Sequence, residues 1–186
     1  MSATTAKLAA LRAATVLKGG GLLAHHTATL PGVAANPRST QAINRLCRFK
    51  QRPGPFLLLA DSQKTALQQI RFFSPHLRKL IRSSWPGAVT IIVPAKPGLS
   101  KQCYNKSRMA IRVDASAQTR RLARACGGLL LSSSLNRKGG KPLEVSRKTC
   151  MRMHRFLNSR LPGLPGSGNA SSILRVWRND STTIRS

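Results

Sequence analysis

Acidic residues are scarce in this chain. Its 186 residues contain only 4 Asp and Glu against 32 Lys and Arg, which gives a net charge of +28 at pH 7. The acids are Asp61, Asp114, Glu144 and Asp180, and no two of them are close in sequence. A two-metal phosphoryl-transfer site or a paired-carboxylate hydrolase needs at least two carboxylates to converge. The sequence therefore disfavours both classes of enzyme.

Cysteines and aromatic residues are also few. The four cysteines (Cys47, Cys103, Cys126, Cys150) lack C-x-x-C spacing, so we expect reduced thiols, no bound structural metal and a cytoplasmic location. Five Phe, two Trp and one Tyr are the whole aromatic supply. Because the core should take most of them, we do not expect a base-stacking platform for single-stranded nucleic acid. No apolar run approaches the length of a membrane span, so no membrane partner is expected.

The composition still supports a folded protein that attracts polyanions. Hydrophobic residues make up 41% of the chain, and its length suits a single domain over residues 1–186. The positive charge is spread along the whole sequence, which makes RNA the obvious polyanionic partner. We expect such contacts to be mainly with the phosphate backbone.

Strand-like and helix-like patterns alternate along the chain without an internal repeat. We expect strands at 22–24, 56–60, 88–93, 109–113, 129–134, 172–177 and 182–185, the last two forming a hairpin around 179–180. We expect helices at 3–17, from a cap at Ser39 to about 49, from 61 or 62 to 70, from 74 to 81, from Ser116 to 125, and from Ser146 to about 158. This alternation predicts one α/β or α+β sheet flanked by helices.

A basic turn stiffened by two prolines lies between a helix and a buried strand. Lys50 and Arg52 are two residues apart on it, so both cations can point into one pocket that binds an anion with several oxygens, such as a polyphosphate. In a chain this basic, an ordinary solvated turn is the alternative.

Polar clusters follow or flank other predicted strands. Residues 132–136 (Ser-Ser-Ser-Leu-Asn) lie where a strand runs into a glycine-rich loop, a place where backbone N–H groups and hydroxyls can hold phosphate. Taken alone, this segment also fits an ordinary Ser-rich strand end. Thr27 and Arg112 have similar positions, and ligands gather at the carboxyl ends of strands in open α/β sheets.

Taken in order, these segments resemble the YrdC/TsaC (RimN) family of threonylcarbamoyl-AMP synthases, of the short, single-domain type. Its Tyr-Pro-Thr-Glu-x-x-x-Gly motif corresponds to 25–32 (His-His-Thr-Ala-Thr-Leu-Pro-Gly), Lys-x-Arg to 50–52, Trp-Pro-Gly-x-x-Thr to 85–90, Ala-Val-Arg to 110–112, Ser-Thr-Ser-Ala-Asn to 132–136 and Pro-Ser-Thr-Ile to 170–173 (Ala-Ser-Ser-Ile). The closing segment of the family, with its Arg, corresponds to 183–185. The resemblance runs from about residue 7 to the C-terminus.

The resemblance implies a twisted, open, mixed sheet with a concave basic cavity, and a definite reaction. The family condenses ATP, bicarbonate and L-threonine into threonylcarbamoyl-AMP and releases pyrophosphate, for the threonylcarbamoyladenosine modification of tRNA. ATP would bring Mg²⁺, and proteins of a tRNA-modification complex would be partners. Joining these substrates is mainly a matter of positioning and charge neutralisation, which cations and hydroxyls can provide.

The resemblance also assigns roles to individual residues. Lys50 and Arg52 would be catalytic and would hold the phosphates. Ser134, Asn136 and Arg185 would complete the ATP site. Around threonine the resemblance places Thr27, Arg112, Ser132 and Ser171, with Arg112 on the carboxylate.

The sequence departs from the family pattern in several places. His25-His26 stands in place of Tyr-Pro, Ala28 replaces the Glu, and the loop after Arg52 is shorter. An alternative function is therefore a catalytically eroded protein on the same fold that binds double-stranded RNA, tRNA or rRNA, for example in ribosome maturation. The high positive charge favours this alternative.

Overall fold

A computed structural model of the protein describes residues 3–177 and 180–186. Its strands are β1 (Leu22–His25), β2 (Gly32–Ala35), β3 (Leu57–Ala60), β4 (Val89–Pro94), β5 (Arg108–Val113), β6 (Leu129–Ser134), β7 (Leu157–Leu161), β8 (Ser172–Val176) and β9 (Ser181–Arg185). Its helices are α1 (Ala3–Lys18), α2 (Thr40–Lys50), α3 (Gln63–Gln69), α4 (Pro75–Ser84), α5 (Ala117–Ala125) and α6 (Arg147–Arg152), with a 3-10 turn η1 (Lys101–Cys103).

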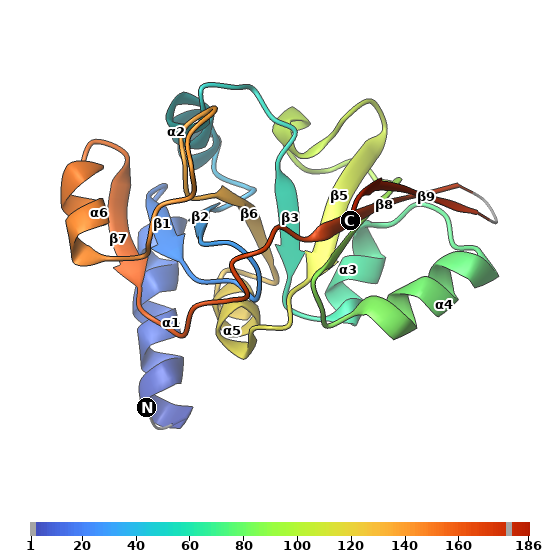
Figure 1. The fold of residues 1–186 in the computed structure, drawn as a ribbon, viewed down its shortest axis with the longest axis horizontal. Helices are drawn as coiled ribbons and strands as arrows, with labels where there is room; N and C mark the ends of the chain where they lie inside the picture. Colours follow the sequence, from blue (N-terminus) through green and yellow to red (C-terminus); the bar gives the residue numbers. More distant parts are fainter. Residues whose placement is uncertain (1–2, 178–179) are drawn as a thin grey trace.

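All of these strands belong to one open, mixed sheet (Figure 1). The strand order is β7-β1-β2-β6-β3-β5-β4-β8-β9. The pairs β1/β7, β3/β5 and β4/β8 are parallel, and the other neighbours are antiparallel. The prediction of a single mixed sheet flanked by helices is confirmed.

Serine side chains begin five of the helices. Each accepts a hydrogen bond from a backbone N–H in the first helical turn, which satisfies a donor that has no partner inside the helix. These capping serines are Ser39, Ser62, Ser74, Ser116 and Ser146. The predicted caps are confirmed, with Ser62 rather than Asp61 starting α3.

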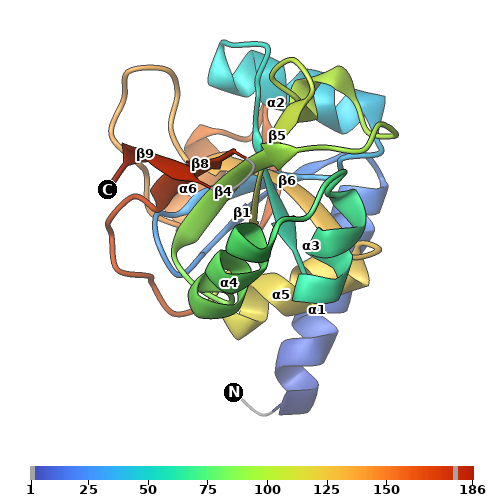
Figure 2. The same ribbon diagram turned by 90° about the vertical axis from the view of Figure 1, so that its right-hand side faces the viewer.

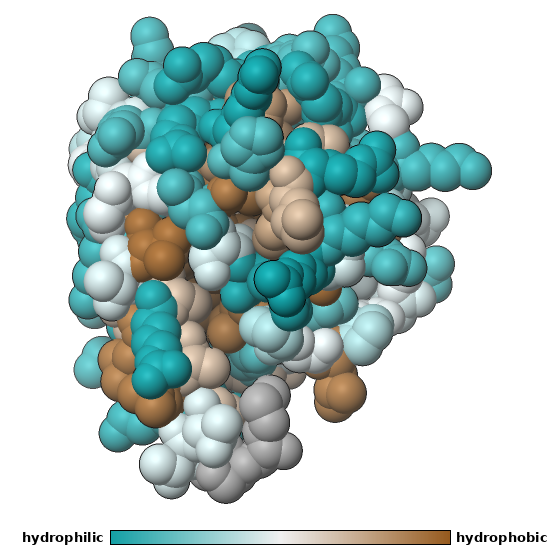
Figure 3. All heavy atoms as spheres, turned by 90° about the vertical axis from the view of Figure 1, so that its left-hand side faces the viewer, coloured by the Kyte–Doolittle hydropathy of each residue, from teal (hydrophilic) through white to brown (hydrophobic). Residues whose placement is uncertain are grey.

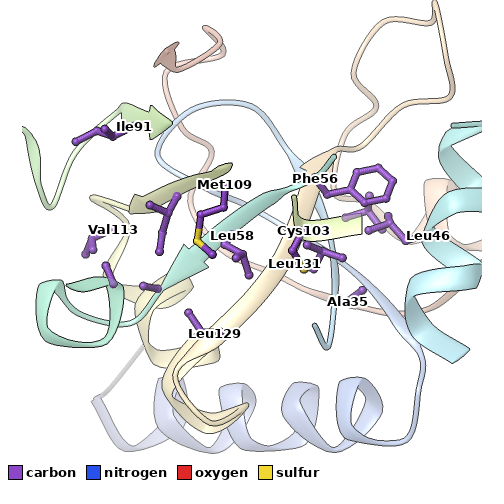
Figure 4. Close-up of a cluster of buried hydrophobic side chains, with 14 of the residues drawn as sticks. Ala35, Leu46, Phe56, Leu58, Ile91, Cys103, Met109, Val113, Leu129 and Leu131 are labelled. Atoms are coloured by element: carbon purple, nitrogen blue, oxygen red, sulfur yellow. The ribbon is translucent and has the colours of Figure 1, made fainter. Parts of the chain in front are cut away.

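The sheet is covered on both faces over most of its width, and alternate residues of each strand enter different cores. Leu58 and Leu131 face α2, α3 and α4 in the larger core (Figure 4), whereas Leu59 and Leu130 face α1 and α5 in the smaller one. Strands buried on both faces read as continuous apolar runs instead of alternating patterns. This explains the runs 56–60 and 129–131.

Two segments differ from the sequence prediction. The helix expected from Ser146 to about 158 ends at Arg152, and the chain then turns into β7. Asn158 lies in this strand, and its Oδ1 accepts a hydrogen bond from Leu22 N at 3.0 Å. Pairing with β1 therefore overrides the helical spacing of the apolar residues at 153–157. Strand β2 was not predicted, because a four-residue Gly-Val-Ala-Ala segment has little pattern of its own.

The hairpin of β8 and β9 lies at one edge of the sheet. β8 and β9 pair antiparallel as expected, although the turn residue Asn179 lies outside the described residues. On the face that carries α6 and β7, hydrophilic side chains dominate the upper half and hydrophobic groups are scattered below (Figure 3). Within the described ranges, none of the helices is long and apolar enough to cross a membrane.

Candidate functional site

A cavity of about 260 Å³ lies on the face of the sheet that α1 and α5 only partly cover. Ser132 pairs with Ala34, and Arg112 pairs with Leu59, and both of these apolar partners belong to the core under α1 and α5. Paired residues share a face of the sheet, so the serine and the arginine lie on this same face, beyond the helices. The uncovered part of the sheet is thus the floor of the cavity.

Two loops form walls of this cavity. The loop between β1 and β2 carries Thr27, and the chain from 162 to 171 runs along it. Ser167 N donates to Ala28 O at 3.0 Å, and a Cβ on Gly166 would lie 2.5 Å from Thr29 O. Glycine is therefore required at 166 for this close backbone approach. The contact holds the segment that leads to Ser171 against the cavity.

Thr27 is buried, and its hydroxyl organises its own loop. Its Oγ1 donates to Leu30 O at 2.8 Å, accepts from Thr29 N at 3.1 Å and lies 3.0 Å from Thr29 Oγ1. The threonine thus shapes the wall of the cavity as well as lining it. Its neighbour Thr29 was not singled out from the sequence.

Arg112 is buried at the floor and is paired with a buried acid. Its Nη2 lies 2.7 Å from Asp114 Oδ2, and its Nη1 donates to Thr29 Oγ1 at 3.1 Å. Asp114 Oδ1 accepts from Ala28 N at 2.8 Å and from Ser116 N at 2.9 Å. One carboxylate therefore ties the floor strand, the loop of Thr27 and the start of α5 together. The Arg112 Nε is buried without a hydrogen-bond partner among the described residues.

The C-terminal strand brings a second guanidinium to the cavity. Arg185 donates from Nε and Nη2 to Ser171 O at 2.9 and 2.7 Å, and Ser171 Oγ lies 3.0 Å from Thr90 Oγ1. Thr90 is the last residue of the Trp-Pro-Gly-x-x-Thr segment. Its role as a lining residue was missed, although that motif was the available signal.

The basic turn does not direct both of its cations into the cavity. Arg52 lines it, donates to Pro55 O at 2.8 Å and lies over the ring of Phe56 at 4.6 Å. Lys50 is not among the lining residues. It is the last residue of α2 and is only 4% exposed. Both cations were expected to point into one pocket; Arg52 lines the cavity, and Lys50 does not.

The ammonium group of Lys50 is enclosed by oxygens of the loop after β6. Its Nζ donates to Ser134 O at 2.9 Å, to Asn136 Oδ1 at 2.8 Å and to Asn136 O. Ser134 Oγ in turn donates to Asn136 Oδ1 at 2.6 Å. The pKa of Lys50 is lowered to about 8, mainly by burial and to a smaller extent by the charge of Arg52. Lys50 and Asn136 thus hold Ser134, which does line the cavity.

The structure brings most of the sequence-predicted site residues together. Seven line the cavity: Thr27, Arg52, Arg112, Ser132, Ser134, Ser171 and Arg185. Lys50 and Asn136 lie behind the wall, in contact with Ser134. Among the described lining residues there are three guanidinium groups and no carboxylate. Such a site suits a ligand with anionic oxygens.

None of the four cysteines lines the cavity. All four cysteines are free, and burial raises the pKa of Cys103 and Cys126 to about 11, so these thiols are protonated at neutral pH. Over the described part of the chain, His, Cys, Asp and Glu form no group of three or more that could hold a metal ion.

His25 is buried beside Ser132, on the same face of the sheet as the cavity. Its Nε2 lies 3.4 Å from Ser132 Oγ, and a Cβ on Gly32 would lie 2.8 Å from the same nitrogen. Burial lowers the pKa of His25 from 6.5 to about 4, despite the opposing effect of the Asp114 charge. The imidazole is therefore neutral at neutral pH.

This burial predicts a pH-dependent stability. Between about pH 6.5 and 4 the unfolded chain binds a proton that the folded chain excludes, so the free energy of unfolding falls with falling pH. The loss across this window is about 3 kcal/mol. Urea unfolding at a series of pH values measures it, and the variant His25→Gln should show a shallower dependence. The same dependence in both proteins would contradict this origin.

Comparison with known sequences identifies relatives. The sequence model named for Sua5, YciO and YrdC, described as "Telomere recombination", matches residues 15–186. A threonylcarbamoyl-AMP synthase of Thiobacillus denitrificans is 34% identical over 144 residues, which are 74% of this chain and 74% of that protein. A threonylcarbamoyl-AMP synthase of Stenotrophomonas maltophilia is 31% identical over 159 residues, 83% of this chain and 86% of that protein.

Solved structures share the fold. Escherichia coli YciO superposes with a TM-score of 0.85 at 17% identity, over 96% of this chain and 89% of that one. Sua5 of P. abyssi in complex with L-threonine has a TM-score of 0.85 at 19% identity, over 95% of this chain and 53% of that one. At such identities the likeness shows a common fold.

Proposed function

The chain belongs to the Sua5/YciO/YrdC family, and on that premise we propose that it is a threonylcarbamoyl-AMP synthase. It would condense ATP, bicarbonate and L-threonine and release pyrophosphate, as an enzyme of the cytoplasm. The observation that carries the proposal is the cavity, where three arginines and a group of hydroxyls converge on the uncovered face of the sheet. A zwitterion and two anions require this kind of lining.

The deep end of the cavity would hold threonine. Arg112 lines the floor of the cavity, and its guanidinium would pair with the substrate carboxylate. The hydroxyls of Ser132 and Ser171 and the wall built by Thr27 would contact the amino and hydroxyl groups. A cavity of about 260 Å³ is close to the lower end for ligand sites, so an amino acid would fill its deep end and ATP would extend out from its mouth. These are the roles that the family resemblance implies for these residues.

The outer end would hold ATP with its Mg²⁺. Arg52 is half-buried at the wall and would contact the phosphates, with Ser134 and Arg185 beside the nucleotide. Asn136 would act through its hydrogen bond to Ser134. The same holds for Lys50, which would be a positioning residue because its ammonium group already faces three protein oxygens.

The reaction then needs no protein carboxylate pair. The neutral threonine amine attacks the carbon of bicarbonate; a C–N bond forms, the C–OH bond breaks, and the hydroxide leaves with an amine proton as water, which gives a carbamate. A carbamate oxygen attacks the α-phosphorus of ATP, the bond to the β-phosphate oxygen breaks, and pyrophosphate leaves. Developing negative charge falls near Arg52 and Arg185, where fixed cations stabilise it most. Ala28, in place of the family's glutamate, is compatible with this scheme.

Binding of threonine gives a first test. Isothermal titration calorimetry should show L-threonine binding in the presence of ATP and Mg²⁺. L-serine, which lacks the methyl group, should bind about tenfold more weakly, because one methyl group is worth about 1.4 kcal/mol in a fitted pocket. L-valine, which lacks the hydroxyl, should bind more weakly still. Equal binding of all three amino acids would contradict the assignment of the deep end.

A second candidate function is an RNA-binding protein that has lost the chemistry. The net charge of +28 and the His25-His26 and Ala28 replacements favour it. Both candidates include RNA as a partner, since the synthase product is used to modify tRNA, and proteins of a tRNA-modification complex would then be further partners. Threonine binding separates the two, because an eroded site should not retain it.

A further inference from the structure

Three aromatic side chains are exposed at the end of the molecule formed by α4 and the β8–β9 hairpin. Phe72 is 62% exposed, Phe73 39% and Trp177 52%. Together with Leu77 and Val176 they line a hollow of about 460 Å³. Figures 1 and 2 place α4 at the same end of the molecule as this hairpin. Aromatic rings gathered on an exposed patch indicate an interaction surface.

Arginine side chains lie over two of these rings. The guanidinium of Arg71 is 5.1 Å from the ring centre of Phe72, and that of Arg108 is 4.0 Å from the ring of Trp177. Arg108 Nη1 also donates to Val176 O at 3.0 Å, which fixes its position. Each guanidinium therefore covers one face of a ring and makes a cation–π contact with it. The exposed remainder of each ring is open to a further planar group.

Lysine and arginine side chains also lie on both sides of the aromatic hollow. Beside Phe73, two more hollows are lined by basic residues of α4, among them Arg78 and Arg82. Beyond Trp177, a hollow of about 340 Å³ is lined by Lys106 and Arg175, and it shares Pro55 and Ala110 with the candidate site. Among the described residues that line these four hollows there is no acid. The carboxylate of nearby Asp180 accepts a hydrogen bond from Ser181 N.

We propose that this aromatic–basic surface, centred on Phe72, Trp177, Arg108 and the basic face of α4, binds a single-stranded stretch of RNA. Unpaired bases would stack on the open sides of the Phe72 and Trp177 rings. Phosphates would lie along Arg78, Arg82 and Arg108. Stacking rings interleaved with cations are the combination that single strands require. A base-paired A-form helix keeps its bases stacked internally and could use the cations alone.

The charge of the surface argues for this occupant. A second copy of the chain would bring the same positive field against it, which opposes self-association. An acidic protein segment could neutralise the cations but would leave the flat rings without stacking partners. The proposal does not depend on the reaction in the cavity, so binding should be measured without ATP or threonine.

Binding of labelled oligonucleotides tests the proposal. We would titrate the protein with fluorescein-labelled oligouridine and with an A-form RNA duplex of the same length, at several salt concentrations. The single strand should bind more tightly than the duplex. It should also quench the fluorescence of Trp177, whereas Trp85 is only 3% exposed and should contribute little to the change. The variant Phe72→Ala/Trp177→Ala should bind the single strand at least about tenfold more weakly. The salt slope, which is the slope of the logarithm of the binding constant against the logarithm of the salt concentration, should stay the same, because no charge is removed.

Matched variants separate stacking from charge. Trp177→Phe keeps a ring and should bind within about threefold of wild type. Arg78→Ala/Arg82→Ala should weaken binding and lower the salt slope. Lys7→Ala/Arg12→Ala removes the same charge from α1, at the other end of the molecule, and should have a smaller effect (Figure 1). Thermal unfolding should confirm that each variant is folded.

Several outcomes would overturn the proposal. One is equal binding of the single strand by wild type and Phe72→Ala/Trp177→Ala. Another is preference for the duplex without quenching, which would indicate phosphate contacts only. A third is concentration-dependent dimerisation in sedimentation that the aromatic variant abolishes. Loss of ATP or threonine binding in the cavity would leave this test unaffected.

Discussion

Replacing Arg112 with alanine is expected to lower the free energy of unfolding by about 3–5 kcal/mol and to abolish threonine binding. Asp114 is fully buried, and its Oδ2 lies 2.7 Å from the guanidinium. Without Arg112 this carboxylate keeps two backbone donors but loses its only ion-pair partner among the described residues. A buried charge left without its counter-ion is strongly destabilising. Urea unfolding and calorimetry with L-threonine measure the two effects.

A double variant distinguishes the structural effect from the loss of the ligand. In Arg112→Met/Asp114→Asn both charges are removed together and the side-chain volumes are nearly kept. Its stability should return to within about 2 kcal/mol of wild type, because no buried charge is left unpaired. Threonine binding should stay lost. Threonine binding by this double variant would show that the guanidinium does not contact the substrate.

Lys50→Met is expected to lower the free energy of unfolding by about 3 kcal/mol, and activity should fall with it. The substitution removes the donor shared by Ser134 O, Asn136 O and Asn136 Oδ1 in a partly buried position, so three hydrogen bonds to a charged group are lost together. The loop that holds Ser134 would then lose its position. Chemical unfolding and pyrophosphate release, measured on the same preparation, test both expectations.

Arg52→Ala is the matched comparison. Arg52 makes one hydrogen bond to Pro55 O and a contact with the ring of Phe56, so its loss should change the stability by less than about 1 kcal/mol. Pyrophosphate release should nevertheless fall by about a hundredfold, because a cation aimed at the phosphates is removed. If Lys50→Met were stable and inactive while Arg52→Ala stayed active, the two assigned roles would have to be exchanged.

The sequence predicted the local structure well where local chemistry decides it. Serines such as Ser74 cap the helices that follow them, and the β-branched run 88–93 forms β4 within one residue at each end. The failures occur where distant contacts decide. The segment 157–161 becomes a strand because β1 is available to pair with it, and nothing in its own residues indicates that.

In the candidate site, too, the sequence predicted what local motifs decide and missed what distant contacts decide. Motif order placed seven residues around one cavity, from Thr27 to Arg185, but it could not show which way a side chain points. Lys50 turns inward because α2 ends at that residue and carbonyl groups of the loop after β6 surround its ammonium group. The buried partner Asp114 was likewise invisible, although it follows Arg112 by two residues. The aromatic count suggested that few rings would be exposed, yet Phe72, Phe73 and Trp177 lie on the surface.

The central proposal is tested most directly by pyrophosphate release from ATP in the presence of Mg²⁺, bicarbonate and L-threonine. Wild-type protein should release pyrophosphate only when all these components are present, and carbon-labelled bicarbonate should enter the adenylated product. Arg52→Ala, which should fold normally, is the control and should release about a hundredfold less. Threonine-independent release, or no release by protein that binds RNA tightly, would contradict the synthase assignment.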